Sequence, residues 1–324
     1  MPCDVSSAPY LSIVVPLYRD EASLPGIFAR IGAVMDDFPS AELVLVNDGS
    51  PDRTGPVAVE LAKAFPHPIT VVNLTRNFGQ HPAVFAGFEH SRGDVVVTID
   101  SDMQYRPEEI GRLVAELSPE YPVVSGYRED RSDPWPRGVL TRLLTRWLNH
   151  QTGSNLRDYG SMFRAYRRSV VDELLLFREQ RRYVPALVGW LGVPVKEIAV
   201  AHDRRGEQGS RYRLGALIEM LLDLITGYAT FPMRVVTAVG LVGSLLGLAA
   251  TLTFLIYRIV GGAGASGLVS AFAMVFFLAA VQLFILGFIG EYVGRVYIEA
   301  KGRPYYLVSS VVTDRELESS PRGE

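Results

Sequence analysis

Two uncharged apolar runs near the carboxyl end of the chain limit its fold more than any other feature. Residues Val235–Tyr257 and Leu268–Gly290 contain no charged side chain, and each is long enough to cross roughly 30 Å of hydrocarbon as a helix. The connection between them, Arg258–Gly267, is short and rich in glycine, alanine and serine, so the two helices would form an antiparallel hairpin. Buried core helices are the alternative, but two such runs in succession favour a membrane hairpin with both chain ends on one side.

The basic residues around this hairpin indicate which side that is. Only Arg258 lies in the connection, and the positive-inside rule then places the flanking segments in the cytoplasm. Met1–Tyr10 lacks a basic segment followed by an apolar core, so no secretory signal is expected. The single cysteine, Cys3, can form no internal disulfide, which agrees with a reducing compartment. We expect a multi-pass protein of the cytoplasmic (inner) membrane with both termini in the cytoplasm. The flanking basic residues are Arg204, Arg205, Arg211, Arg213, Arg234, Arg295, Lys301 and Arg303.

The residues before the hairpin alternate between short apolar runs and amphipathic segments. This alternation predicts an α/β fold, in which a doubly wound sheet carries helices on both faces. The predicted strands are Leu11–Tyr18, Glu42–Asn47, Ile69–Leu74, Val95–Ile99 and Tyr121–Arg128. The predicted helices are 23–35, Gly55–Ala64, Pro82–His90, Arg137–Trp147 and one that begins near Ser169.

The strand Val95–Ile99 runs into two carboxylates and an amide, Asp100, Asp102 and Gln104. The carboxyl ends of parallel strands form the edge at which α/β sheets bind ligands. In an extended segment alternate residues point the same way, so these side chains would gather hard oxygen ligands for Mg²⁺ or Mn²⁺ bound to a diphosphate. Turn chemistry without any ligand is the alternative for an isolated Asp-Ser-Asp.

The other common ways to bind phosphate or nucleic acid have no support in the sequence. No G-x-G-x-x-G and no G-x-x-x-x-G-K-[ST] follows a predicted strand, so neither a dinucleotide-binding fold nor a P-loop is indicated. A net charge of −3 without a basic tract argues against nucleic acid as a partner. A carboxylate-bound metal would hold phosphate without either motif.

Short motifs along the amino-terminal domain resemble those of one enzyme family. They are Val15–Tyr18, Asn47–Ser50, Arg76–His81 and Asp100–Gln104, in the order and spacing of the GT-A glycosyltransferases of family 2. Asp158–Arg168 and Gly290–Tyr297 are similar to segments of the polyprenyl-phosphate glycosyltransferases within that family. The resemblance runs from Leu11 to Val308 and implies a GT-A (Rossmann-like) fold with a mixed, mostly parallel sheet.

The resemblance also implies roles for individual residues. It implies catalytic roles for Asp100, Asp102 and Asp158, and nucleotide-binding roles for Pro16, Tyr18, Asp20, Asp48 and Asp100. It implies that Asp102 and Gln104 bind Mg²⁺ or Mn²⁺, and that Arg128, Arg137 and Arg205 bind the acceptor phosphate. Guanidinium groups suit phosphate oxygens because they donate two parallel hydrogen bonds. The alternatives are a solvated helix face for Arg137 and a turn or cap for Asp158.

Two motifs near the implied donor site depart from the family pattern. Arg19 and Asp20 stand where the family usually has asparagine and glutamate, so the carboxylate is on a shorter side chain, and Asn47 stands where it usually has aspartate. A third departure lies in the loop that contains Arg205, where Gln208 replaces the usual glycine. Because of these differences, the family pattern does not identify which nucleotide and which sugar this chain binds, or the shape of that loop. His81 has no partner at metal-ligand spacing and is expected to be an ordinary hydrogen-bonding residue.

The family resemblance implies a metal-dependent, inverting transfer of a sugar to undecaprenyl phosphate or another polyprenyl phosphate at the cytoplasmic membrane face. The implied donor is UDP-linked, such as UDP-4-deoxy-4-formamido-L-arabinose. A polyprenyl- or dolichyl-phosphate mannose or glucose synthase that uses GDP-mannose or UDP-glucose stays open. So does a non-catalytic membrane scaffold on a degenerate transferase fold. A processive polysaccharide synthase is disfavoured because no Q-x-x-R-W motif occurs.

These patterns divide the chain into four parts. The expected parts are a cytoplasmic catalytic domain at 1–210, interfacial juxtamembrane helices at 211–234, the transmembrane hairpin at 235–293 and a cytoplasmic tail at 294–324. The second part is assigned from apolar residues at helical spacing before the first span. Gly243-x-x-x-Gly247 and Gly290-x-x-x-Gly294 would permit close helix packing within the hairpin or between subunits. A homo-oligomer, such as the tetramers of relatives, therefore stays open.

Overall fold

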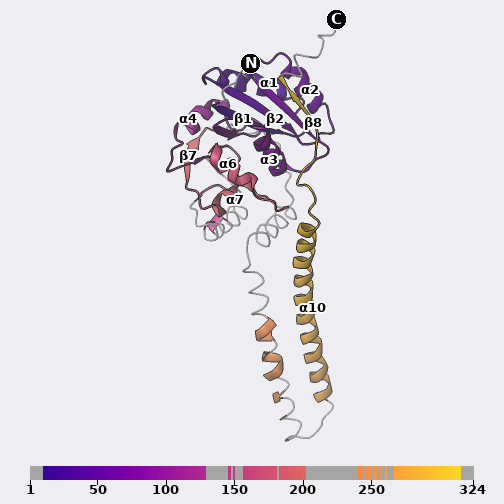
Figure 1. Cartoon of the computed structure of the whole chain (residues 1–324). Coiled ribbons are helices and arrows are strands. Elements are labelled where there is room, and N and C mark those ends of the chain that lie inside the picture. The colour runs from indigo at the N-terminus through magenta and orange to yellow at the C-terminus, as the bar shows by residue number, and fades with distance from the viewer. Residues whose placement is uncertain are drawn as a thin grey trace, which may run out of the picture. The chain divides into compact units, whose positions relative to one another are not determined.

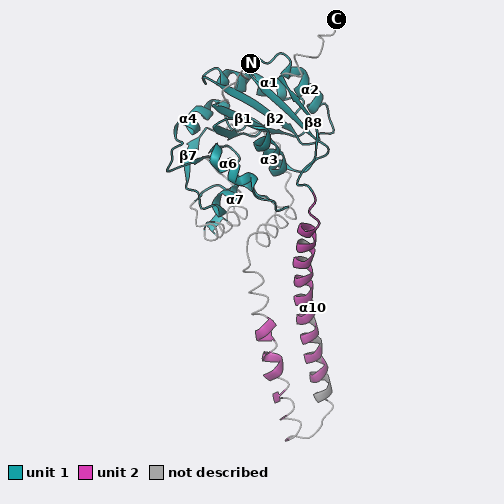
Figure 2. Ribbon diagram, viewed as in Figure 1, with its two compact units in different colours: residues 1–209, 304–324 teal, residues 210–303 magenta. Residues whose placement is uncertain are grey.

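The structure of the protein is a computed structural model. It describes residues 10–128, 145–146, 149, 156–180, 182–201, 240–243, 245–249, 252–253, 256, 260 and 266–314. The chain divides into two compact units, and each is described by itself (Figure 2). The first comprises residues 1–209 and 304–324, and the second comprises 210–303.

The first unit is built on one eight-stranded sheet in the order β7-β5-β6-β4-β1-β2-β3-β8 (Figure 1). The strands are β1 Leu11–Leu17, β2 Ala41–Asn47, β3 Ile69–Leu74, β4 Val95–Thr98, β5 Val123–Arg128, β6 Arg164–Arg167, β7 Val195–Val200 and β8 Val308–Thr313. The helices are α1 Leu24–Met35, α2 Thr54–Ala62, α3 Gln80–His90, α4 Ile110–Ala115, α6 Arg168–Leu175 and α7 Val184–Trp190, with a short 3₁₀ helix at Pro107–Glu109. The mixed α/β architecture expected from the sequence is confirmed.

The centre of this sheet is parallel and buried on both faces. β1 pairs in parallel with β2 and with β4, and β2 pairs in parallel with β3. Helices α1 and α2 lie on one face of the sheet, and α3 and α6 lie on the other (Figure 1). Because these helices cover both faces, the side chains on both faces of the central strands are buried. The strands therefore appear in the sequence as continuous apolar runs. Helix α3 approaches β1 closely at Gly87, where a Cβ atom would lie 2.2 Å from Cγ1 of Val14.

Three antiparallel pairings flank this parallel centre. β6 lies between β4 and β5 and is antiparallel to both, while β8 is antiparallel to β3 at the other edge. The strands β6, β7 and β8 were not among those predicted from sequence. Residues 308–313 were expected in a separate tail, and in the structure they are an edge strand of the sheet. Thr70 of β3 faces Thr313 of β8 across this pairing.

The second unit contains one long helix, α10, at Ser266–Ala300. Within the described residues, Phe277–Ala300 is the one helical stretch long and apolar enough to cross a membrane. The described parts of the first apolar run pack on α10 in reverse order, since Gly240 faces Ile285 and Gly247 faces Leu278. This order is that of antiparallel helices. The predicted interfacial helices at 211–234 and nearly all of the predicted helix at 137–147 lie outside the described residues.

Candidate active site

The loops that follow β1, β2 and β4 meet at the carboxyl edge of the parallel strands. The chain moves from β1 to β2 on one side and later to β4 on the other side, and ligands of open α/β sheets bind at such a switch point. Ser101 Oγ, after β4, donates a 2.6 Å hydrogen bond to Oδ2 of Asp20, after β1. The backbone N–H of Arg19 donates to Oγ of Ser50, after β2, at 3.2 Å. The structure thus joins three loops that are far apart in sequence.

Asp20 organises the loop that follows β1. Its Oδ2 also accepts the backbone N–H of Tyr18 at 2.8 Å, and its carbonyl oxygen accepts the N–H groups of Ser23 and Leu24 at the start of α1. The turn passes through Arg19, which has a left-handed φ of 59°. As a result, the ring of Tyr18 and the side chain of Arg19 are both exposed, with the guanidinium carbon 5.4 Å from the ring centre.

Asp48, at the end of β2, binds the backbone of a neighbouring loop. Its side chain is buried, and its two carboxylate oxygens accept the N–H groups of Phe78 at 2.7 Å and Gly79 at 2.8 Å. Burial raises the pKa of the Asp48 carboxyl, against the effect of these two hydrogen bonds and of nearby Arg76. Asp48 therefore shapes the Arg76–His81 loop, while its contact with a nucleotide stays a prediction.

The segment after β4 does not stay extended, so the expected alternation of side chains is wrong. Ser101 and Asp102 form a turn, and Met103 has a left-handed φ of 56°. The turn forms because Oδ1 of Asp102 accepts the backbone N–H of Gln104 at 3.1 Å, which is typical Asp turn chemistry. The Asp102 side chain is exposed. Turn and metal site are thus compatible, since this turn leaves the Asp102 carboxylate facing solvent.

A metal at this turn would need ligands from outside the chain. Within the described residues, no group of three or more His, Cys, Asp and Glu side chains could hold a metal ion. Mg²⁺ commonly takes one or two protein oxygens together with substrate phosphates and water. The carboxylate of Asp102 and the amide oxygen of Gln104 fit that requirement. Asp100 accepts a hydrogen bond from the side-chain amide of Gln80, at the start of α3.

Asp158 is a buried residue of the turn before β6. Its Oδ1 accepts the N–H of Gly160 at 2.9 Å, so the turn expected as an alternative is present. Its own backbone N–H donates to Oε1 of Glu197 on β7 at 3.2 Å, and its carbonyl oxygen accepts from Nη2 of Arg164 on β6 at 3.3 Å. Burial raises the pKa of the Glu197 carboxyl, while hydrogen bonds from the N–H groups of Arg157 and Asp158 lower it.

One protein-family model matches the part of the chain that contains all of these loops, including the turn of Asp158. The model described as "Glycosyl transferase family 2" matches residues 12–175. The chain belongs to glycosyl transferase family 2. It is therefore a glycosyltransferase, and the resemblance inferred from the motifs is confirmed.

Relatives match this family 2 enzyme over nearly its whole length. An undecaprenyl-phosphate 4-deoxy-4-formamido-L-arabinose transferase of Sodalis glossinidius is 38% identical over 312 residues, which are 95% of this chain and 96% of that protein. Transferases of the same name are 36% identical in Aeromonas hydrophila, covering 97% of each chain, and 39% identical in Pseudomonas aeruginosa, covering 93% and 90%. A crystal structure of glucosyl-3-phosphoglycerate synthase from Mycobacterium tuberculosis with UDP aligns with a TM-score of 0.49 at 21% identity, over 67% of this chain and 78% of that one.

The predicted acceptor-binding arginines of this family 2 enzyme are only partly placed. Arg128 is the last residue of β5, where its backbone pairs with Val200 of β7. Its side chain, and all of Arg137 and Arg205, lie outside the described residues. The structure also brings in Gln80, Ser101, Arg164 and Glu197, which the motif reading did not assign. Gln80, Ser101 and Arg164 lie inside the motifs Arg76–His81, Asp100–Gln104 and Asp158–Arg168 and could have been found there, whereas Glu197 lies outside every motif and gave no local signal.

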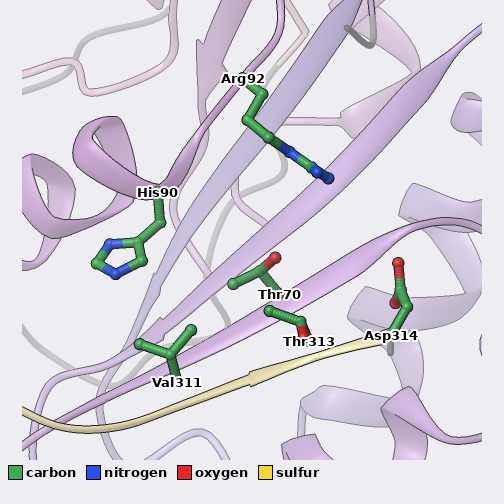
Figure 3. A pocket seen from close by; sticks show the side chains of 6 residues that line it. All are labelled: Thr70, His90, Arg92, Val311, Thr313 and Asp314. Carbon is green, nitrogen blue, oxygen red and sulfur yellow. The ribbon is translucent and has the colours of Figure 1, made fainter. Parts of the chain in front are cut away.

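The family 2 sheet also carries a hollow at its opposite edge. The hollow has a volume of about 340 Å³ and lies near the start of β3 and the end of β8 (Figure 3). Arg92 is the main basic residue in its lining, and its guanidinium is already paired with a carboxylate, because Nε and Nη2 donate to Oε2 of Glu42. It lies at the amino ends of the parallel strands and takes no part in the site described above. Its lining residues are Thr70, His90, Arg92, Val311, Thr313 and Asp314.

Proposed function

We propose that this enzyme transfers a sugar from a nucleotide-diphosphate donor to undecaprenyl phosphate or a related polyprenyl phosphate at the cytoplasmic face of the membrane. The observation that carries the proposal is the match to named undecaprenyl-phosphate transferases over 93–97% of the chain. That match includes α10, which has the length and composition of a membrane span. A shared catalytic domain alone would support sugar transfer but not a lipid acceptor.

The donor is proposed to be UDP-linked 4-deoxy-4-formamido-L-arabinose, as the names of the relatives suggest. The nucleotide would lie along the loops after β1 and β2, near Pro16, Tyr18, Asp20 and Asp48. Support comes from the exposed ring of Tyr18 and the adjacent cation of Arg19. A base can stack on an aromatic ring, and a guanidinium is attracted to diphosphate oxygens. Arg19 would thus serve the donor where relatives use another residue.

Asp102 and Gln104 are proposed to hold Mg²⁺ or Mn²⁺. When bound, the ion would stabilise the negative charge of the departing nucleotide diphosphate. Asp100 would orient the donor, because its carboxylate is held by Gln80. Asp158 would stand near the donor sugar, held in its turn by Gly160.

The acceptor needs alignment more than activation. A phosphate monoester has a second pKa of about 6, so its attacking oxygen is already largely an anion at neutral pH and no general base is required. Arg128, Arg137 and Arg205 are proposed to bind that phosphate in line with the anomeric carbon. A single displacement of this kind inverts the configuration at the anomeric carbon.

The arrangement in the membrane is proposed from the sequence. Residues 1–210 would form the cytoplasmic catalytic domain, 211–234 an interfacial segment, 235–293 a transmembrane hairpin and 294–324 a cytoplasmic segment that returns to the sheet through β8. Both termini would be cytoplasmic. Self-association into a homo-oligomer is compatible with this arrangement.

The direct test is an assay of the purified full chain with undecaprenyl phosphate and a panel of nucleotide sugars. The panel contains UDP-4-deoxy-4-formamido-L-arabinose, UDP-glucose and GDP-mannose, and mass spectrometry identifies the lipid product. A product only with the first donor supports the proposal. A product only with GDP-mannose or UDP-glucose would replace the proposed sugar but keep the acceptor. Absence of any lipid product, together with no metal-dependent nucleotide binding by calorimetry, would indicate a non-catalytic scaffold.

A further inference from the structure

Two charged side chains from different strands hold the backbone of Asp158 from opposite sides. Glu197 on β7 accepts the N–H groups of Asp158 at 3.2 Å and of Arg157 at 2.9 Å. Arg164 on β6 donates from Nη2 to the carbonyl oxygen of Asp158 at 3.3 Å, and from Nε to the carbonyl oxygen of Ser161 at 3.0 Å. Both polar groups of the Asp158 backbone are thus bound by ionisable side chains. We call Arg164 and Glu197 the Asp158 clamp.

Burying the charged side chain of Arg164 at this position costs free energy. Its side chain is fully buried and is the largest fully buried side chain among the described residues. Its Nη1 has no hydrogen-bond partner in the part of the chain that the structure describes. A buried charge with an unsatisfied donor costs free energy that a well-packed apolar side chain would not. Packing alone therefore does not explain an arginine here.

The position of Arg164 places the clamp beside the carboxylates of the site. In the sheet, Arg164 pairs with Thr98 of β4, two residues before Asp100. On the other side it pairs with Ser125 of β5, the strand that ends at Arg128. Arg164 also lies close enough to His81 for its charge to lower the pKa of that ring, and His81 adjoins Gln80, which binds Asp100.

We propose that Arg164 and Glu197 are positioning residues for the glycosyl transfer, which act by fixing the backbone of Asp158 relative to β4. The inference rests on the proposed function, in which Asp158 stands near the donor sugar. Within the turn, Oδ1 of the Asp158 carboxylate accepts the N–H of Gly160, and the next residue, Tyr159, accepts a hydrogen bond at its carbonyl oxygen from the hydroxyl of Tyr183; the clamp residues are the ones that bind the backbone of Asp158 itself. Without the clamp the turn could shift, and a shift of about 1 Å at a reacting centre can cost about a hundredfold in rate.

The chain offers a matched control for Arg164. Arg168, at the start of α6, likewise donates from Nε to a backbone carbonyl, that of Gly93, at 2.8 Å, and from Nη2 to Oγ of Ser91. These contacts precede β4 and lie at the edge of the sheet away from the site. A variant of Arg168 removes a similar set of hydrogen bonds without touching the turn of Asp158.

The first test compares Arg164→Met, Glu197→Met and Arg168→Met in the full chain, reconstituted in lipid nanodiscs, by amide hydrogen exchange. The clamp predicts faster exchange at residues 157–163 in the first two variants and unchanged exchange there in Arg168→Met. This measurement needs no substrate, so it stands even if the proposed function fails. Equal exchange at 157–163 in all three variants and the parent chain would overturn the clamp.

The second test uses the transfer assay. Arg164→Met is expected to lower kcat by about 30- to 100-fold with the donor KM changed less than about threefold, and Arg164→Lys is expected to recover part of the loss. Arg168→Met is expected to keep kcat within about threefold at a comparable loss of thermal stability. If Arg168→Met lowers kcat as far as Arg164→Met does, the role of Arg164 is merely structural and the proposal is wrong.

Discussion

Asp48 and Gly79 are joined by a 2.8 Å hydrogen bond from the Gly79 N–H to Oδ2 of the buried carboxylate. The other oxygen of Asp48 accepts the Phe78 N–H, so both acceptor atoms of this side chain are used by the loop before α3. The next residue, Gln80, begins α3 and binds Asp100. A carboxylate at the end of β2 thus supports the orientation of a carboxylate after β4.

Replacing Asp48 by asparagine tests this relationship. Asparagine supplies one acceptor oxygen, so one of the two partly buried backbone N–H groups would lose its partner, at a cost of about 1 kcal/mol. We expect a lower thermal unfolding midpoint in detergent and a raised donor KM, because the loop before α3 would loosen. Asp172→Asn, at an exposed position of α6, is the control. An unchanged midpoint in Asp48→Asn would show that the two hydrogen bonds do not hold the loop.

Of the two proposed metal ligands, Asp102 should contribute more to metal binding and therefore to metal-dependent transfer. Asp102→Ala is expected to lose at least about a hundredfold in transfer rate at saturating Mn²⁺, and to weaken Mn²⁺-dependent binding of the nucleotide by calorimetry. Its exposed position predicts little effect on folding. Treatment of the parent enzyme with EDTA should abolish transfer, and added Mn²⁺ or Mg²⁺ should restore it. Near-full activity of Asp102→Ala with either ion would remove Asp102 from the metal site.

His81 should make the stability of the enzyme depend on pH. The buried Nδ1 of His81 has no partner among the described residues, and its ring packs edge-on against Tyr183. Burial, with the charge of Arg164, lowers the pKa of His81 from 6.5 to about 4. The folded state therefore favours the neutral ring. Its contribution is fully present above pH about 6.5 and is lost as the pH falls towards 4.

This shift corresponds to up to about 2 kcal/mol of stability between pH 7 and pH 5. His81→Phe keeps the edge-on ring contact but cannot take up a proton. Its unfolding midpoint in detergent should therefore fall less than that of the parent between pH 7 and pH 5. His90→Gln, at the other end of α3, is the control for the loss of a histidine elsewhere on the same helix. Parallel midpoint curves for His81→Phe and the parent would contradict the assignment.

The second unit makes a prediction about its own packing. At Gly247 a Cβ atom would lie 2.5 Å from Cδ2 of Leu278, whereas nothing lies within 4 Å of a Cβ at Gly290. Gly247→Val should therefore force the two helices apart and cost about 1–3 kcal/mol. Gly290→Val should leave this packing intact. The measurement is disulfide formation between cysteines introduced at Gly243 and Val281, in a background without Cys3, with and without each valine. Equal cross-linking in both variants would show that Gly247 is not at a close contact.

The sequence by itself determined the parallel centre of the fold. Strands β1–β4 of this centre, β5 beside it and helices α1–α3 lie within a few residues of where they were predicted. The buried parallel strands are apolar throughout, and α1 carries a clear helical period. The family followed from the same stretch, since its motifs sit at the ends of those strands. Each of these signals is local, and so it can be read without knowing what the segment will contact.

The tertiary structure decided the remainder, because it depends on partners distant in the chain. β8 is a short, partly exposed strand, and its place next to β3 depends on a pairing with residues more than 230 positions earlier. Asp48 and Asp158 look alike in sequence as polar residues in turns, yet one binds the Phe78–Gly79 backbone and the other has its own backbone bound by Arg164 and Glu197. Local patterns identify which residues are polar and lie at the sheet edge. Only the folded chain fixes which oxygen accepts which N–H.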